Sequence, residues 1–191
     1  MSEKASVVTA DRFKQGFTYG DFIAQINVNQ DRFAQYDGTA KDVVTDEDTA
    51  FFKKAVEKGC RVLVLGEDWC PDVYRGMPVI ARIAEASGTE MRVFPRDANL
   101  DIMNQFLKDD LHQSIPTFVF YTEGHKYLCH WIERPAQATK EMAEITPIQE
   151  AYAYNISRLA EAFCLDRKTV RKRINQAMVK PVSKRNGQPV Y

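Results

Sequence analysis

The chain has 191 residues with a formal net charge of zero, and 45% of its residues are hydrophobic. This size and composition fit a folded protein of one domain, or of one domain with a small appendage. No apolar run approaches the 18 residues that a transmembrane helix needs, and residues 1–15 lack the apolar core of a secretory signal. We therefore expect a cytoplasmic protein with no membrane partner.

The charge is distributed unevenly along the chain. Residues 157–191 contain nine Lys or Arg and two acidic residues, so this segment has a net charge of +7 and the rest of the chain has −7. Such asymmetry predicts two units with different partners, of which the basic one is a candidate for binding nucleic acid.

The first third of the chain is expected to be helical. Residues 1–16 are polar and are predicted to form a flexible N-terminus. Apolar residues at helical spacing predict one helix over 20–36, ended by an Asp-Gly pair. Thr45 and the acidic turn after it predict a second helix over 46–58.

The central region alternates strand and helix patterns. Residues 60–66 read CRVLVLG, a short apolar run that predicts a buried strand. Pro71 suits the first turn of a helix that ends near Ser87-Gly88. The remaining expected elements are a strand over 91–97, a helix over 100–109, paired strands over 116–122 and 126–133, and a helix over 136–145. This order predicts an α/β fold, a mixed sheet with helices on both faces.

The stretch GEDWCPDVYRGMP, residues 66–78, places a thiol where the buried strand gives way to a helix. Backbone N–H groups and the helix dipole favour the thiolate of Cys70 at such a position. Trp69 beside it offers a flat apolar surface. Asp68 and Asp72 act in the opposite direction, because nearby negative charge disfavours a thiolate. A half-buried, inert cysteine is the alternative interpretation.

This region resembles the thioredoxin family. In that family a W-C-x-x-C motif follows the central strand, a proline stands eight residues after the first cysteine, and an Ile-Pro-Thr follows about 45 residues on. The matching residues here are Trp69, Cys70, Pro78, Ile115, Pro116 and Thr117. The resemblance covers about 17–145 and implies a thioredoxin-like domain over 17–146, with a cis proline at position 116 facing the cysteine. The sequence EDWC is similar to the corresponding motif of a bacterial thioredoxin-like subfamily with a WCGD-type site.

The chain departs from the family at Val73, which occupies the place of the second cysteine. A dithiol enzyme resolves its mixed disulfide with that second thiol. Turnover here would need an external thiol, such as glutathione or another low-molecular-weight thiol, as co-substrate. Cys60 lies at the far end of its strand, and Cys129 is expected to be a buried core thiol. The resemblance therefore implies a monothiol site that acts on protein or small-molecule thiols. A thiol sensor and a degenerate remnant are the alternatives.

No cofactor and no metal are expected. The four cysteines form no C-x-x-C pair and have no metal-ligand spacing to the three histidines. Free thiols in a reducing compartment are the corresponding expectation.

Residues 156–178 predict two short helices joined by a turn at Cys164-Leu165, with Asp166 as the cap of a cationic second helix. This is a helix-turn-helix pattern, which fits double-stranded DNA, and we assign it to a unit over 147–191. The residues best placed to contact DNA are Arg167, Lys168, Thr169, Arg171, Lys172 and Arg173. Asn186-Gly187 is a hairpin turn signal.

The sequence over about 154–191 resembles that of the small terminase subunits of DNA-packaging phages. A homodimer would supply the second half-site that a lone helix-turn-helix lacks. A solvated basic helix packed on the first domain is the alternative. Three functions remain open at this point: a thiol domain joined to a DNA-binding unit, a monothiol oxidoreductase with a tail that does not bind DNA, and a catalytically inert thioredoxin-fold protein that binds DNA.

Overall fold

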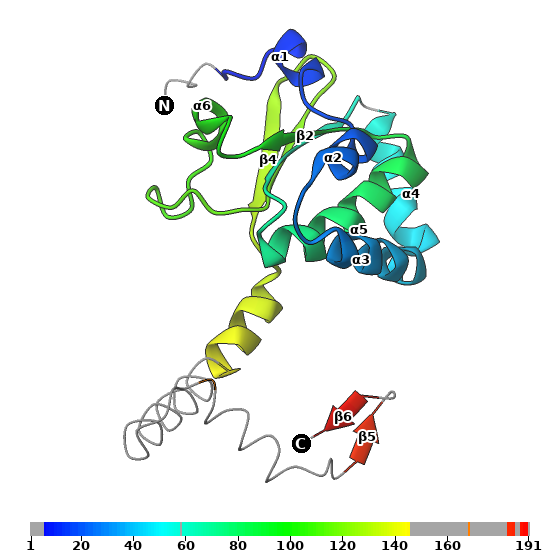
Figure 1. Cartoon of the computed structure of the whole chain (residues 1–191). Coiled ribbons are helices and arrows are strands. Elements are labelled where there is room, and N and C mark those ends of the chain that lie inside the picture. Colours follow the sequence, from blue (N-terminus) through cyan, green and yellow to red (C-terminus); the bar gives the residue numbers. More distant parts are fainter. Residues whose placement is uncertain (1–5, 58, 146–167, 169–182, 186–187, 191) are drawn as a thin grey trace. The chain divides into compact units, whose positions relative to one another are not determined.

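The computed structural model of the chain describes residues 6–57, 59–145, 168, 183–185 and 188–190 (Figure 1). The chain divides into two compact units, Met1–Arg134 and Pro135–Tyr191, which are described separately below.

The first unit is built on a four-stranded mixed sheet with the strand order β2-β1-β3-β4. The strands are β1 (Arg61–Gly66), β2 (Glu90–Pro95), β3 (Thr117–Tyr121) and β4 (Tyr127–Ile132). β1 pairs in parallel with β2, and β3 is antiparallel to both β1 and β4. The central strand β1 is apolar and buried along almost its whole length, as its sequence predicts.

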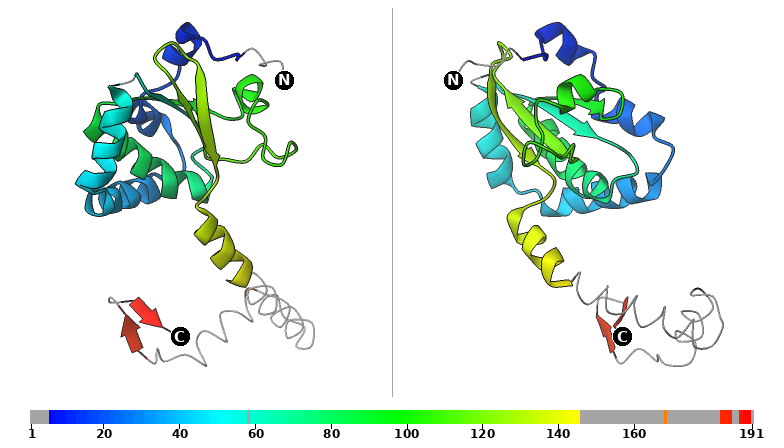
Figure 2. Two further views of the ribbon diagram at one scale, coloured as in Figure 1. Left: turned by 180° about the vertical axis from the view of Figure 1, so that it is seen from behind. Right: turned by 90° about the vertical axis from the view of Figure 1, so that its left-hand side faces the viewer.

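Helices cover both faces of this sheet (Figure 2). They are α1 (Ala10–Lys14), α2 (Tyr19–Gln25), α3 (Gln30–Val43), α4 (Asp46–Val56), α5 (Pro71–Ser87) and α6 (Leu100–Met103). α3 and α4 both pack against α5. Phe52 of α4 contacts Phe120 of β3, which places this helical layer on one face. α6 and α1 lie on the other face, where Phe106 stacks on Tyr127. The predicted α/β fold with helices on both faces is confirmed.

Local sequence signals set several helix ends as expected. Thr45 and Asp48 form a reciprocal capping box at the start of α4. Pro71 is the first residue of α5, and Gly88 ends that helix in the left-handed conformation at φ 75°. These ends are encoded by residues within four positions of the helix terminus, which is why the sequence alone predicts them.

The expectation of a flexible N-terminus over 1–16 is wrong for residues 8–16. Val8 and Phe13 are buried in the core, and Thr9 caps α1. The Phe13 ring lies 5.2 Å from the ring of His125. Two apolar anchors therefore hold a segment that is otherwise polar, and polar composition alone did not reveal them.

The helix predicted over 20–36 is two helices, α2 and α3, and α3 continues past the expected stop to Val43. The break has a long-range cause, because the carboxylate of Asp68 accepts hydrogen bonds from the backbone N–H groups of Asn27 and Val28. Gly38 does not end α3, because the next turn buries Ala40 in the core.

Two further expectations are corrected near the edge strand β4. The helix predicted over 100–109 ends at Met103, and the buried Phe106 beyond it packs on His130, with ring centroids 5.4 Å apart. Cys129 is exposed and not a core thiol. It lies on β4, one of the two edge strands, whose first four residues are all exposed.

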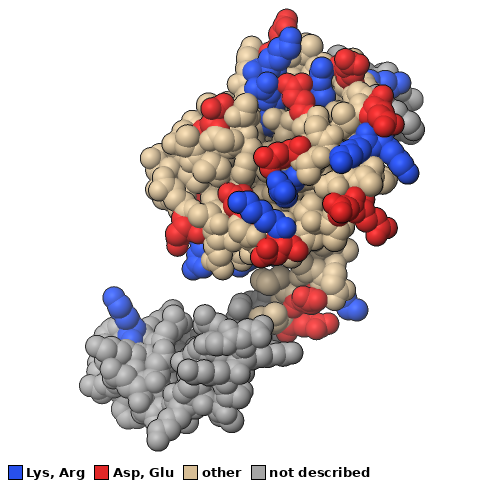
Figure 3. Space-filling model, turned by 90° about the vertical axis from the view of Figure 1, so that its right-hand side faces the viewer, with Lys and Arg blue, Asp and Glu red and all other residues tan. Residues whose placement is uncertain are grey.

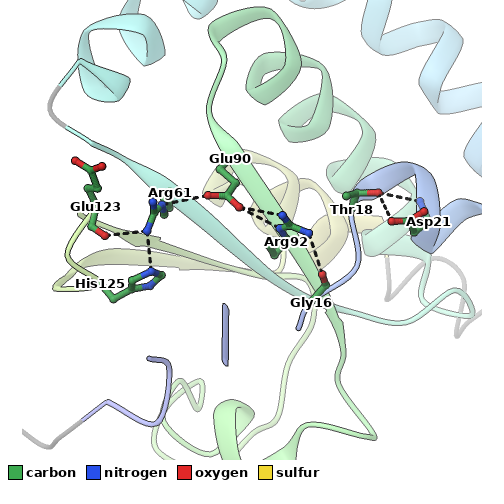
Figure 4. Close-up of polar contacts among 8 residues, drawn as sticks. All are labelled: Gly16, Thr18, Asp21, Arg61, Glu90, Arg92, Glu123 and His125. Atoms are coloured by element: carbon green, nitrogen blue, oxygen red, sulfur yellow. Dashed lines mark hydrogen bonds and ion pairs between the residues drawn. The ribbon is translucent and has the colours of Figure 1, made fainter. Parts of the chain in front are cut away.

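A polar cluster closes the end of the sheet where β1 begins (Figure 4). Arg61 donates to the carbonyl oxygen of Glu123 and to Nε2 of His125, each at 2.8 Å, and pairs with Glu90 at 3.2 Å. Glu90 also binds Arg92 at 3.0 Å. Burial and the Arg61 charge lower the pKa of His125. A guanidinium can only donate, so Nε2 of His125 must accept, which requires a neutral ring.

The described part of the second unit comprises a helical segment over 136–145 and two short strands. β5 (Ser183–Arg185) and β6 (Gln188–Val190) pair antiparallel on either side of positions 186 and 187, where the hairpin signal lies. The predicted helix-turn-helix over 156–178 lies outside the described residues, except for Lys168, which is exposed. Within the described ranges, no helix is long and apolar enough to cross a membrane.

Candidate thiol site

Cys70 forms the N-cap of α5, directly after the loop that leaves β1. The residue is only 8% exposed, and its thiol donates to the carbonyl oxygen of Ile115 across a distance of 3.6 Å. The Cys70 carbonyl accepts from the N–H groups of Val73 and Tyr74, at 3.1 and 3.3 Å, as the first bonds of the helix. The thiol therefore lies at the N-terminus of a 17-residue helix.

The loop before β3 faces this thiol. The peptide bond between Ile115 and Pro116 is cis, which is the isomer that the sequence suggests. The Thr117 hydroxyl donates to the Ser114 carbonyl at 2.8 Å, and the Pro116 carbonyl accepts from the N–H of Glu133 at 2.7 Å. The structure thus brings together Cys70 and the Ile-Pro-Thr segment, which are 45 positions apart.

Val73 occupies the position of a second active-site cysteine, and its side chain is completely buried. A Cβ atom placed on Gly66 would lie 3.0 Å from Val73 Cγ1 and 2.8 Å from Met77 Cε. Val73 therefore packs tightly against the end of β1. The other described cysteines, Cys60 and Cys129, are free. Cys60 directly precedes β1, at the end of the strand away from Cys70, and burial together with the nearby Cys129 raises the pKa of Cys60.

Asp68, one of the two acidic neighbours of Cys70, is held by backbone. Its carboxylate accepts from the N–H groups of Asn27 and Val28 at 3.0 and 3.2 Å. The Asn29 side chain donates to the Asp68 carbonyl at 2.9 Å. The turn between α2 and α3 is thereby fastened to the thiol loop. Nothing in the local sequence of residues 27–29 signals this contact.

Asp72, the other acidic neighbour, pairs with two arginines. Its carboxylate lies 2.5 Å from Nη2 of Arg134 and 4.0 Å from Nη1 of Arg75. The Asp72 side chain is 18% exposed. Arg134 follows β4 in the chain, 62 positions from Asp72, and the sequence did not identify it as part of the site. An Arg-Pro pair at the end of a hairpin is too common a pattern to indicate this role.

Trp69 presents an exposed aromatic surface next to Cys70. Its side chain is 48% exposed, and the guanidinium carbon of Arg96 lies 5.2 Å from the ring centroid, a cation–π contact. Arg96 is itself fixed by a 3.0 Å hydrogen bond to the Gln113 carbonyl. Glu67, on the same loop, accepts from the N–H of Asp97 at 2.8 Å, and burial raises the pKa of Glu67.

The described residues contain no cluster of three or more His, Cys, Asp or Glu side chains able to hold a metal ion. On the face shown in Figure 3, acidic and basic side chains of the first unit are interspersed. The chemistry that this arrangement offers is that of a single thiol at a helix start.

A family model described as thioredoxin matches residues 16–152. The chain belongs to the thioredoxin family. Residues 153–191 match a second family model, described as a protein of unknown function (DUF1441). Since that description names no activity, the DNA-binding helix-turn-helix stays a prediction. No curated protein matches the chain.

Solved structures share this fold at low sequence identity. The protein of unknown function PA1234 from Pseudomonas aeruginosa aligns at 19% identity and a TM-score of 0.62, over 77% of this chain and 90% of its own. An HIV epitope-scaffold aligns at 23% identity and a TM-score of 0.59, over 70% of this chain and 80% of its own. At these identities the similarity concerns the fold alone.

Proposed function

We propose that Cys70 is the nucleophile of a thiol–disulfide exchange site that works with one cysteine. The observation that carries the proposal is the position of its thiol, at the N-cap of α5 and 3.6 Å from the Ile115 carbonyl, beside Pro116. Val73 fills the place of a resolving thiol with a buried hydrocarbon side chain. In this proposal the site is a variant of the WCGD-type thioredoxin-like subfamily.

The proposed reaction transfers a glutathione group from a mixed disulfide to free glutathione by way of Cys70. The Cys70 thiolate attacks the glutathione sulfur of a mixed disulfide R–S–S–G, a Cys70–S–S–G bond forms, and R–S⁻ leaves and takes up a proton. A glutathione thiolate then attacks the glutathione sulfur on Cys70. Oxidised glutathione forms, and the Cys70 thiolate is regenerated. The net change is R–S–S–G plus GSH giving R–SH plus GSSG.

The substrate class follows from what surrounds the thiol. Trp69 supplies an exposed aromatic surface on which a peptide or small-molecule thiol could rest. The second step needs a low-molecular-weight thiol in excess, a condition that a reducing cytoplasm provides. Where such a thiol is limiting, the mixed disulfide would persist and the same site would act as a thiol sensor.

The test is reduction of a glutathionylated peptide by glutathione, followed through the formation of oxidised glutathione. The full chain should accelerate the reaction, and Cys70→Ser should remove the acceleration. Cys129→Ser is the matched control, because Cys129 is a second free thiol and is exposed on the edge strand β4. Equal rates for the unmodified chain and Cys70→Ser would show that Cys70 does not catalyse this exchange, and the proposal would be wrong.

Binding of double-stranded DNA by the second unit is the second candidate function. Its support is the cationic composition of 157–191 together with the family boundary at residue 153, which separates this segment from the thioredoxin match. In this proposal Arg167, Lys168, Thr169, Arg171, Lys172 and Arg173 contact DNA, and a homodimer supplies two half-sites.

Salt dependence tests the DNA proposal. Affinity for a generic duplex should fall steeply between about 50 and 200 mM salt, because phosphate contacts release counterions. Replacing Arg171, Lys172 and Arg173 with Gln should flatten that slope, whereas Lys53→Gln in α4 of the first unit should leave it unchanged. A binding constant that does not respond to salt would contradict the proposal.

A further inference from the structure

We propose that Arg134 is a positioning residue for the Cys70 thiol. Its ion pair with Asp72 keeps the charge of that carboxylate from disfavouring the thiolate. The inference rests on the proposed exchange function of Cys70. It also explains how an acidic residue is accommodated two positions after the nucleophile.

The ion pair spans the two sides of the site. Asp72 is the second residue of α5, so its carboxylate lies on the helix turn that begins at Cys70. Arg134 follows Glu133, whose N–H binds the Pro116 carbonyl at 2.7 Å. The 2.5 Å contact from Arg134 to Asp72 therefore connects the segment that supports the cis proline with the start of the helix.

Arg134 is the cation best placed to balance Asp72. The Arg75 guanidinium is 4.0 Å away and its side chain is more than half exposed, so solvent screens that contact. Arg134 is less exposed, and its buried Nε atom has no hydrogen-bond partner in the described part of the chain. Among the described residues, Asp72 is the carboxylate that forms an ion pair with this guanidinium, and the Arg134 charge also acts on the adjacent Glu133.

The other charged groups near the thiol loop already have partners of their own. The Asp68 carboxylate is held by two backbone N–H groups. Arg96 pairs with Asp97 at 2.6 Å, and Glu67 accepts from the Asp97 N–H. Beside Arg134, Glu133 pairs with Lys108 at 2.7 Å. Among these described acidic groups, Asp72 is the one on the first turn of α5, and side-chain cations balance its charge.

The pair predicts effects of opposite sign at Cys70. Removing Arg134 leaves Asp72 unbalanced next to the thiol, which disfavours the thiolate. Removing the Asp72 charge leaves the Arg134 cation unbalanced, which favours the thiolate. Removing both should return the thiol close to its original state. A purely structural role for the pair would shift the reactivity of the buried thiol in the same direction in both single variants, or leave it unchanged in both.

The experiment measures the alkylation rate of Cys70 by iodoacetamide against pH in the full chain, with the Cys70 peptide followed by mass spectrometry. At neutral pH we expect Arg134→Gln to slow alkylation by about threefold to tenfold and Asp72→Asn to accelerate it by about threefold. The double variant should lie within about twofold of the original protein, and Arg134→Lys should retain most of the rate. Arg82→Gln is the matched control, because Arg82 and Glu85 form a 2.9 Å pair on the same helix, distant from Cys70 in sequence.

Changes of the same sign in both single variants, or no change in either, would overturn the inference. If Arg134→Gln does not fold, Asp72→Asn decides alone, and an unaltered or slower Cys70 rate in that variant counts against the inference. Failure of this inference can be told apart from failure of the proposed function. Alkylation does not depend on turnover, so a chain that never exchanges glutathione can still show the opposite shifts.

Discussion

The two ends of β1 carry similar groups arranged for different purposes. At the amino end, Arg61 binds Glu90, His125 and the Glu123 carbonyl oxygen (Figure 4). At the carboxyl end, the ion pairs surround a thiol and leave Trp69 half exposed. Arginine–carboxylate pairs therefore link neighbouring elements at the amino end of β1, and at the carboxyl end the Asp72–Arg134 pair lies on the first turn of the helix that follows Cys70.

The amino end should yield the largest loss of stability. Phe13→Ala removes a buried ring that packs on His125, so we expect about 3 kcal/mol less unfolding free energy in urea. Cys70 alkylation should stay the same, because α1 lies at the other end of the sheet. Phe51→Ala is the control, since the Phe51 side chain is 70% exposed and its loss should change stability little. Equal effects of the two variants would show that α1 is not anchored in solution.

At the carboxyl end of β1, the stability of the protein should be sensitive to added side-chain volume. Gly66→Ala places a methyl group against Met77 and Val73, so we expect a destabilisation of about 1–3 kcal/mol. Gly38→Ala should stabilise the protein by about 0.5–1 kcal/mol, because a helix interior favours Ala and nothing lies within 4 Å of the added group. Both are measured by urea unfolding. If the two substitutions shift stability in the same direction, the packing described at β1 is not correct.

Asp68 joins the thiol end to the helices before it. Asp68→Ala removes the acceptor of two backbone N–H groups, and we expect a loss of about 1–2 kcal/mol. Hydrogen exchange should show faster opening at Asn27 and Val28 than at the amino end of β1. Asp97→Ala is a suitable control, because the Asp97 carboxylate is exposed and its ion pair is with the adjacent Arg96. Uniformly faster exchange along the chain would indicate global destabilisation instead.

The smallest expected effect is the pH response of His125. Its pKa is lower in the folded protein than in the unfolded chain, because of burial and the Arg61 charge. The unfolded chain therefore binds more protons as the pH falls below about 6.5, and stability is lost there. His125→Asn, which tolerates the positive φ of 59°, should reduce this loss in urea titrations at pH 5 and 7. An unchanged pH dependence would mean that His125 stays exposed to solvent.

The sequence predicts what is encoded by neighbouring residues. The capping of α4 by Thr45, the start of α5 at Pro71 and its end at Gly88 all depend on contacts within a few positions. The apolar run of β1 likewise predicts a buried strand. The thioredoxin family, which covers residues 16–152, follows from the resemblance around Cys70 and Pro116.

The features that the sequence missed depend on contacts between distant positions. Asn27 and Asp68 are 41 positions apart, and their contact divides a stretch that has helical spacing throughout. Asp72 and Arg134 meet only after β4 has paired with β3. Cys129 is exposed because of its strand's place at the edge of the sheet, which depends on the whole topology.

A comparison of two thiols within one protein tests the central claim most directly. The native chain is incubated with oxidised glutathione at neutral pH, and glutathionylation of Cys70 and Cys129 is followed by peptide mass spectrometry. Exposure alone favours Cys129, because Cys70 is only 8% exposed. We expect Cys70 to react faster, since the helix N-terminus favours its thiolate and, in our proposal, Arg134 balances the Asp72 charge. Faster modification of Cys129, with Cys70 left unmodified, would contradict the account.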